Sequence, residues 1–144
     1  MIRKAARGDG RILADMAVKM WDSHDADDLA AEFEETLCDE QAAFFIRYAG
    51  DMPVGFAQCG LRTDYVEGTE SSPVGYLEGV FVEESWRRHG YARELLAACE
   101  RWATDMGCSE FASDCELDNT DSLLFHMAMG FEEANRIICF RKTL

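Results

Sequence analysis

The residues from Arg87 to Ala92, RRHGYA, combine positive charge with backbone freedom in a way that suits an anionic ligand. They follow an apolar strand-like run and precede a segment whose apolar residues recur at helical spacing. A helix start offers free N–H groups and the positive end of the helix dipole, and Gly90 allows close approach to the backbone. The loop therefore predicts a phosphate-binding site, although an ordinary strand–helix junction with solvated arginines has the same pattern.

Two acidic residues stand at positions where charge is costly. Glu78 interrupts the apolar run YLEGVFV, and Asp114 ends the next expected strand. A carboxylate inside a central strand is tolerated where it faces a cleft or a partner. On adjacent strands, the two side chains could flank one cavity and grip the ammonium groups of a cationic substrate. The alternatives are an arginine partner for Glu78 and a turn or cap role for Asp114.

The elements that would hold these residues alternate between strand and helix patterns. Strands are expected at 2–5, 43–48, 54–61, 74–82, 110–114 and 136–142, and helices at 9–21, 27–37, 90–106 and 119–129, with Asp9, Asp27 and Asn119 as N-caps. The strands on either side of the helix 90–106 should be parallel. The polar loop 63–73 is long enough to suggest a function. The order β-α-α-β-β-β-α-β-α-β predicts an α/β fold with a mixed central sheet.

Composition limits the classes of protein that are possible. With 144 residues, of which 48 % are hydrophobic, the chain is expected to form one globular domain spanning 1–144. A formal net charge of −14 argues against nucleic acid binding. No apolar run suits a membrane span or a secretory signal, so a cytoplasmic location is expected. The six cysteines form no CxxC pair and no cluster with histidine, so we expect neither a disulfide framework nor a metal site.

The charges are unevenly distributed along the chain. Nine acidic residues lie between Lys19 and Arg47 with no Lys or Arg among them, and the loop 63–73 adds three more. The basic loop at Arg87 stands apart from both. An anion-binding end and a cation-attracting end would produce this asymmetry, whereas a solvated acidic helix face would account for half of it.

Two motifs resemble those of a known family. Arg87-x-x-Gly90-x-Ala92 resembles the pyrophosphate loop, (Q/R)xxGx(G/A), of the GCN5-related N-acetyltransferases, and 119–131 resembles a helix of that family that begins with Asn and ends in Gly-Phe. A more specific likeness, to aminoglycoside 6′-N-acetyltransferases, is carried by the dispersed segments WDSH, DYVEG, SSPVGYLEGVFV, ASD and MGFEE. The resemblance implies an enzyme that acetylates the 6′-amine of aminoglycoside antibiotics by direct transfer and so confers resistance.

The resemblance also implies roles for particular residues. Acetyl-CoA would be the co-substrate, and its binding residues would be Val80, Val82, Arg87, Arg88, His89, Gly90, Tyr91, Ala92 and Asn119. Asp114 would be the general base, and Glu78 would be a second carboxylate for the acceptor. His126 stands where many family members have a tyrosine as general acid, and a histidine held by local hydrogen bonds is the alternative.

The acceptor site implied by the resemblance further includes Trp21, His24 and Tyr65, whose rings suit a sugar. Core packing for Trp21 and a solvated ring for Tyr65 are the alternatives. A homodimer is expected, because related enzymes commonly pair through their C-terminal halves. Two other functions are compatible with the same residues. They are acetylation of another cationic amine, such as a polyamine, an amino acid or a protein N-terminus, and binding of acyl-CoA without catalysis.

Overall fold

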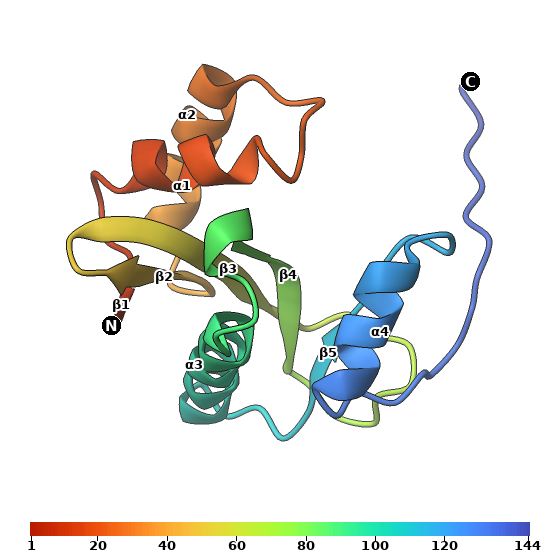
Figure 1. Ribbon diagram of the computed structural model, residues 1–144. Coiled ribbons are helices and arrows are strands. Elements are labelled where there is room, and N and C mark those ends of the chain that lie inside the picture. The colour runs from red at the N-terminus through yellow and green to blue at the C-terminus, as the bar shows by residue number, and fades with distance from the viewer.

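A computed structural model describes all residues, 1–144, and contains one five-stranded sheet with its strands in chain order (Figure 1). The strands are β1 (Ile2–Lys4), β2 (Ala42–Ala49), β3 (Met52–Arg62), β4 (Val74–Val82) and β5 (Phe111–Ser113). The pairs from β1 to β4 are antiparallel, and β5 is parallel to β4. The mixed α/β fold is confirmed, as is the parallel pairing expected for strands joined by a helix.

Helices cover both faces of this sheet. α1 (Gly10–Ala17) and α2 (Ala26–Leu37) pack on one face, and α3 (Tyr91–Asp105) packs on the other (Figure 1). The short turn η1 (Glu84–Trp86) leads from β4 to the loop before α3, and α4 (Thr120–Ala128) lies beside β5. None of the helices is both long and apolar enough to cross a membrane.

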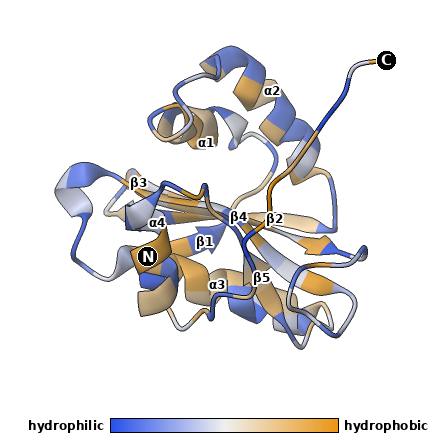
Figure 2. Cartoon of the chain, turned by 90° about the vertical axis from the view of Figure 1, so that its right-hand side faces the viewer, coloured by the Kyte–Doolittle hydropathy of each residue, from blue (hydrophilic) through white to orange (hydrophobic).

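Each face of the sheet has its own apolar core. Side chains of α1 and α2 pack on Phe44, Phe56 and Phe81, while the apolar stripe of α3 packs on Leu77 and Val82. Figure 2 shows hydrophobic and hydrophilic residues alternating along these helices, as expected for helices with one buried face. The two cores fix β4, whose residues contribute to both.

β4 is irregular at its acidic residue. Leu77 and Gly79 pair with consecutive residues of β3, which leaves Glu78 as an extra residue without a partner. Bulges of this kind bend a strand and re-aim side chains, and they are common next to active sites. On its other edge, β4 pairs with β5 only as far as Leu77. Beyond that point the two strands separate, and this edge of β4 is open.

The strand expected at 136–142 is not formed, whereas the order from β1 to α4 is as predicted. After α4 the chain has no further helix or strand and runs away from the sheet (Figure 1). Ile137, Ile138 and Phe140 are 60 %, 78 % and 90 % exposed. The prediction that this segment closes the sheet is wrong for the single chain, because the fold brings no partner strand to it.

The first two helices begin differently from the predictions. α2 has Asp25 as its N-cap, and not Asp27, because Asp25 Oδ1 accepts hydrogen bonds from the N–H groups of Asp27 and Asp28. Asp9 precedes α1, but its side chain does not cap that helix. α1 also ends at Ala17 and not near Trp21. Local sequence located both helices, but several nearby acids could serve as caps.

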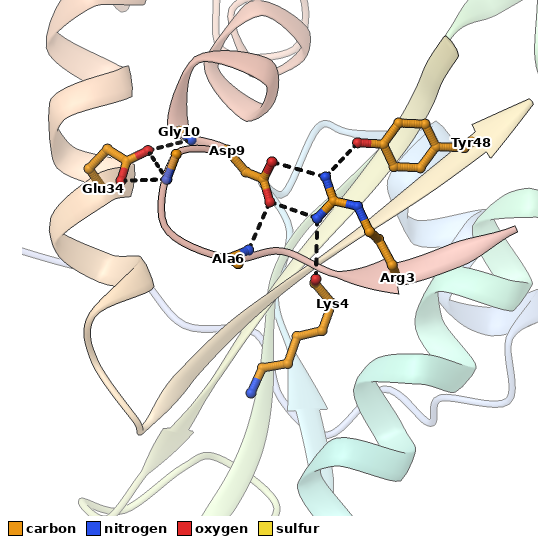
Figure 3. A network of polar contacts seen from close by, with 8 residues as sticks. Arg3, Lys4, Ala6, Asp9, Gly10, Glu34 and Tyr48 are labelled. Atoms are coloured by element: carbon orange, nitrogen blue, oxygen red, sulfur yellow. Dashed lines mark hydrogen bonds and ion pairs between the residues drawn. The ribbon is translucent and has the colours of Figure 1, made fainter. Parts of the chain in front are cut away.

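The carboxylate of Asp9 is bound by Arg3, whose two terminal guanidinium nitrogens, Nη1 and Nη2, donate to it at 2.7 and 2.9 Å (Figure 3). This contact holds the pKa of Asp9 below its usual value. The free N–H groups at the start of α1 are bound instead by Glu34 of α2. Its Oε1 accepts a hydrogen bond from the N–H of Gly10 at 2.7 Å and from that of Gly8 at 3.1 Å. Part of the acidic tract on α2 therefore has a structural role.

Candidate functional site

The loop between η1 and α3 has an unusual backbone. Arg88 and Gly90 both have positive φ, 66° and 78°, and α3 begins directly afterwards at Tyr91. The N–H groups of 88–93 donate no hydrogen bond to the rest of the chain, and no side chain caps the helix. Successive free N–H groups in such a turn, at a helix N-terminus, form a concave surface that suits an anion.

Positive charge surrounds this loop without carboxylate partners. Arg87, Arg88 and Arg93 take part in none of the ion pairs of the chain. Arg87 is oriented by a hydrogen bond from its Nε to the carbonyl of Val82 at 2.9 Å. Because no acidic side chain neutralises the three guanidinium groups, their charge is available to a phosphate.

The remaining side chains of the loop make contacts within the protein. The ring of Tyr91 stacks on Trp86 with an interplanar angle of 19°, and the ring of His89 also packs against Trp86. His89 Nδ1 lies 2.9 Å from the carbonyl oxygen of Arg87. Ala92 packs against the core beneath α3. These three residues shape the loop, so their contribution to an anion site would come through the backbone.

Val80 and Val82 lie on the open part of β4. Both pair with β3, and the β5 pairing ends before either is reached. The free edge therefore faces the gap between the two strands, with the carbonyl of Val82 already bound to Arg87. An unpaired strand edge binds extended amide-containing ligands through main-chain hydrogen bonds. This edge leads directly into the anion-binding loop.

Glu78 and Asp114 belong to one polar cluster at the point where β4 and β5 separate. Arg62 Nη2 lies 2.9 Å from Glu78 Oε1, and Arg62 Cζ lies 3.5 Å from the centroid of the Tyr76 ring. The Tyr76 hydroxyl donates a hydrogen bond to Asp114 Oδ2. The structure thus places the two predicted acids in one cluster. It also gives Glu78 an arginine partner, which was the alternative to a substrate-binding role.

Burial and neighbouring charges set the protonation of this cluster. Burial, together with the hydrogen bond to Asp114, raises the pKa of Tyr76 well above its usual value, so its hydroxyl remains a donor. Burial alone would lower the pKa of Arg62, but the hydrogen bond and charge of Glu78 outweigh burial and raise it. With two acidic residues and one basic residue, the cluster has a formal negative charge that suits a cationic acceptor.

Trp21 lies next to this cluster. Its ring packs edge-on against Phe33 and Phe56, and a Cβ atom on Gly79 would come within 2.8 Å of it. Only glycine fits at that position, so the sequence places the Trp21 ring directly over β4, one residue after Glu78. Core packing of Trp21 is therefore confirmed, and the same packing brings the ring to the edge of the site.

His24 and Tyr65 do not contact the acidic cluster. His24 is exposed in the connection after α1, and Tyr65 is 75 % exposed on the loop 63–73. That loop is fastened at Glu67, whose Oε2 accepts a hydrogen bond from Asn135 Nδ2 at 2.9 Å. The proposed contacts of both rings with an acceptor stay predictions.

His126 is held on both sides of its ring. Nδ1 lies 2.7 Å from the carbonyl oxygen of Ser122, and Nε2 lies 2.8 Å from Ser113 Oγ. Because a carbonyl can only accept, Nδ1 is the donor in the first contact. This geometry fits the locally bonded histidine. Asn119 caps α4 as predicted, with Oδ1 accepting from the N–H of Ser122 at 3.1 Å.

Arg62, Tyr76 and Ser113 were missed by the sequence reasoning. Tyr76 and Glu78 are two residues apart on one strand, a spacing that places both on one face and could have identified Tyr76. Arg62 offered no local signal, because it comes from another strand. The register pairs it with Val74, and its side chain reaches along β4 to Tyr76 and Glu78. The same holds for Ser113 and His126, which come from different elements. No group of His, Cys, Asp and Glu side chains could hold a metal ion.

A splayed pair of strands, an anion-binding loop at a helix start and an acidic cluster form a site that suits an enzyme with a phosphate-bearing co-substrate and a cationic acceptor. Residues 11–131 match the sequence profile of the Acetyltransferase (GNAT) family, and the chain belongs to that family. The family membership predicted from the loop and from the segment 119–131 is therefore confirmed.

Individual relatives are similar over nearly their whole length. The chain is 44 % identical over 144 residues to an aminoglycoside N(6′)-acetyltransferase type 1 from Stenotrophomonas maltophilia, covering 99 % of this chain and 93 % of the relative. It is 46 % identical over 124 residues to the corresponding Salmonella typhimurium protein, 86 % of each chain. The structure of AAC(6′)-Iy in complex with the bisubstrate analogue CoA-S-monomethyl-acetylneamine matches with a TM-score of 0.94 and 41 % identity, covering 100 % of this chain and 98 % of the other.

Proposed function

We propose that this protein is an aminoglycoside 6′-N-acetyltransferase that uses acetyl-CoA and thereby confers resistance. The observation that carries the proposal is the layout along β4. An anion-binding loop follows one end of the strand, and the acidic cluster of Glu78 and Asp114 lies where β5 leaves it. One site suits a pyrophosphate and the other suits a polycationic sugar. The relatives bear the name of this activity, and AAC(6′)-Iy binds an analogue that joins CoA to acetylneamine.

The donor would lie along the open edge of β4. Main-chain groups of Val80 and Val82 would bind the pantetheine arm, and the backbone of the loop 87–92 would bind the pyrophosphate with support from Arg87 and Arg88. Asn119, at the start of α4, would border the same gap. The thioester would then lie where β4 and β5 separate, with an N–H group near Val80 available to the developing oxyanion.

The acceptor would enter from the side of the acidic cluster. Glu78 would bind an ammonium group, while Trp21, His24 and Tyr65 would contact the sugar rings. Asp114 would accept a proton from the 6′-ammonium, directly or through a water molecule, and the free amine would attack the thioester carbonyl. The carbon–sulfur bond then breaks, the nitrogen loses a second proton, and the CoA thiolate gains one.

His126 is the candidate donor of the proton to the thiolate. Its Nε2 is bound to Ser113 in the free chain, so that contact has to open before the proton can be passed on. An imidazole ring can carry a proton and pass it on, so a histidine can carry out this step. Replacement by glutamine, which preserves hydrogen bonding to Ser113, separates the acid role from the structural one.

A homodimer accounts for the unused C-terminal strand pattern. β5 is an edge strand with a free outer edge, and 136–142 forms no helix or strand and exposes the apolar side chains of Ile137, Ile138 and Phe140. The segment begins directly after Asn135, which is hydrogen-bonded to Glu67, and it runs away from its own sheet. Pairing of 136–142 with the sheet of a second copy would bury Ile137, Ile138 and Phe140 and cover an edge that is otherwise prone to aggregation. One domain, 1–144, acting in the cytoplasm completes the proposal.

The decisive assay is CoA release with a panel of amines. Kanamycin-type drugs with a 6′-amine should be acetylated, whereas analogues with a 6′-hydroxyl lack the nucleophile at that position and should be inert there. Equal rates on both types would contradict the regiochemistry. Activity confined to spermidine or to a peptide N-terminus would identify an acetyltransferase for another amine, and CoA binding without any turnover would identify a binding module.

A further inference from the structure

Arg62 is a lone cation in an acidic part of the chain. It is the only basic residue between Arg47 and Arg87, and acids flank it on the loop 63–73 and on β4. As the last residue of β3, it lies at the hinge where that loop begins. Its guanidinium group is partly exposed and is held by two neighbouring groups. It bonds Glu78 at 2.9 Å and covers the Tyr76 ring at 3.5 Å.

These contacts are the ones that an ammonium ligand would seek. A carboxylate oxygen and the face of a tyrosine ring together recognise a cation by charge and by cation–π attraction. The ring is itself fixed, since Tyr76 is only 6 % exposed and its hydroxyl is bound to Asp114. Arg62 therefore contacts Glu78 directly and reaches Asp114 through Tyr76.

The guanidinium group is also free to leave. The side chains of Arg62 and Glu78 are 44 % and 36 % exposed, and ion pairs at such exposure contribute little to stability. Arg62 makes no hydrogen bond to the backbone that would hold it in place. A long side chain at the start of an irregular loop can swing outward without disturbing β3 or β4.

We propose that Arg62 is a resident cation of the acceptor site, which an ammonium group of the substrate replaces on Glu78 and on the Tyr76 ring. The inference rests on the proposed function of Glu78 as an acceptor-binding carboxylate. It assigns a specificity role to Arg62. An amine with several charges can displace the guanidinium and still satisfy other acids, whereas an amine with one charge exchanges one cation for another and gains little.

The test is replacement of Arg62 by methionine, which keeps the length of the side chain and removes its charge. Arg11→Met is the matched control, because it also removes one arginine from exposed ion pairs, with Asp15 and Asp27, outside the acceptor site. Calorimetry with kanamycin and with a monoamine should show binding to Arg62→Met that is tighter by about 3- to 10-fold, with the larger gain for the monoamine. Arg11→Met should bind both as the wild type does.

Three results would overturn the exchange. Weaker amine binding to Arg62→Met would mean that Arg62 holds the site together, as would a fall in kcat at unchanged KM that Arg62→Lys restores. Equal gains in Arg62→Met and Arg11→Met would reduce the effect to net charge. Failure of the proposed function gives a different result from failure of the exchange. In that case the wild type itself would not acetylate aminoglycosides, but displacement of Arg62 could still be measured with the amine that the wild type does accept.

Discussion

The hydroxyl group of Tyr76 donates its hydrogen bond to the carboxylate of Asp114 across the end of the β4–β5 pairing. This bond fixes the orientation of the carboxylate at the point where the two strands separate. Asp114→Asn should lower kcat by about 10²- to 10⁴-fold while changing the acceptor KM much less, because a general base is lost. Steady-state kinetics on a 6′-amino drug measures both values. An unchanged kcat would remove Asp114 from the role of base.

Glu78 should act on binding and not on the chemical step. Glu78→Gln removes the charge that is proposed to bind the acceptor, so the acceptor KM should rise by about 10-fold, equivalent to roughly 1.5 kcal/mol for a hydrogen bond to a charged group. The affinity for acetyl-CoA should be unchanged, because the anion-binding loop is untouched. Calorimetry with CoA provides that control, and a parallel loss of CoA affinity would show that Glu78 supports the donor site instead.

Gly90 should be required for CoA binding beyond its effect on folding. Its φ of 78° is strained for a side chain, and Gly90→Val should cost about 1–3 kcal/mol of stability. Gly107→Val is the matched control, since Gly107 has a φ of 92°, ends the same helix and likewise has open space around it. Both variants should lose similar stability in urea unfolding. Only Gly90→Val should lose CoA affinity, and equal CoA affinities would refute the loop assignment.

The ion pair of Asp9 with Arg3 should make stability depend on pH. Arg3 lowers the pKa of Asp9, so the carboxylate stabilises the fold above its unfolded pKa of about 3.9, and this contribution disappears as the pH falls through the folded pKa. Asp9→Asn should cost about 1–3 kcal/mol at pH 7, and the difference from the wild type should shrink below about pH 4. Asp15→Asn, in an exposed pair with Arg11, should stay within about 0.5 kcal/mol of the wild type.

The C-terminal segment should decide the oligomeric state. Light scattering should give the wild type twice the 16.2 kDa of one chain, and the double variant Ile138→Asp with Phe140→Asp the mass of one chain. The two positions are on one face of the expected strand, so both charges would be buried on pairing. Leu117→Asp, which changes another exposed apolar residue outside the segment, should leave the dimer intact. A monomeric wild type would contradict the proposed pairing.

The sequence was most informative where the pattern was local. β4 was predicted from Val74 to Val82 and has those bounds, because an apolar run between a polar loop and a turn specifies a buried strand. The helix ends at Gly107 and Gly130 were likewise readable, since both residues adopt the positive φ that such ends require.

Features that depend on partners were not readable. The cap of α1 comes from Glu34 on α2, and the partner of Glu78 is Arg62 on β3, and both contacts follow from packing and register. The segment 136–142 has the residue pattern of a strand but forms no strand in the single chain. Such a pattern shows that a segment can pair, but it does not specify the strand with which it pairs. The same limit applies to His126, whose contact with Ser113 joins α4 to β5.

The bond from Gly10 to Glu34 has a consequence for how the acceptor range could change over time. It ties the start of α1 to α2, so that the two helices should unfold as one cooperative unit, to be seen as matched hydrogen exchange rates in both. The connection between them, which includes Trp21 and His24, joins the other ends of the two helices, from Ala17 to Ala26. In the proposed acceptor site, substitutions in that connection would reshape the wall while the helices hold their positions, which would make it a tolerant place for new drug specificities to arise.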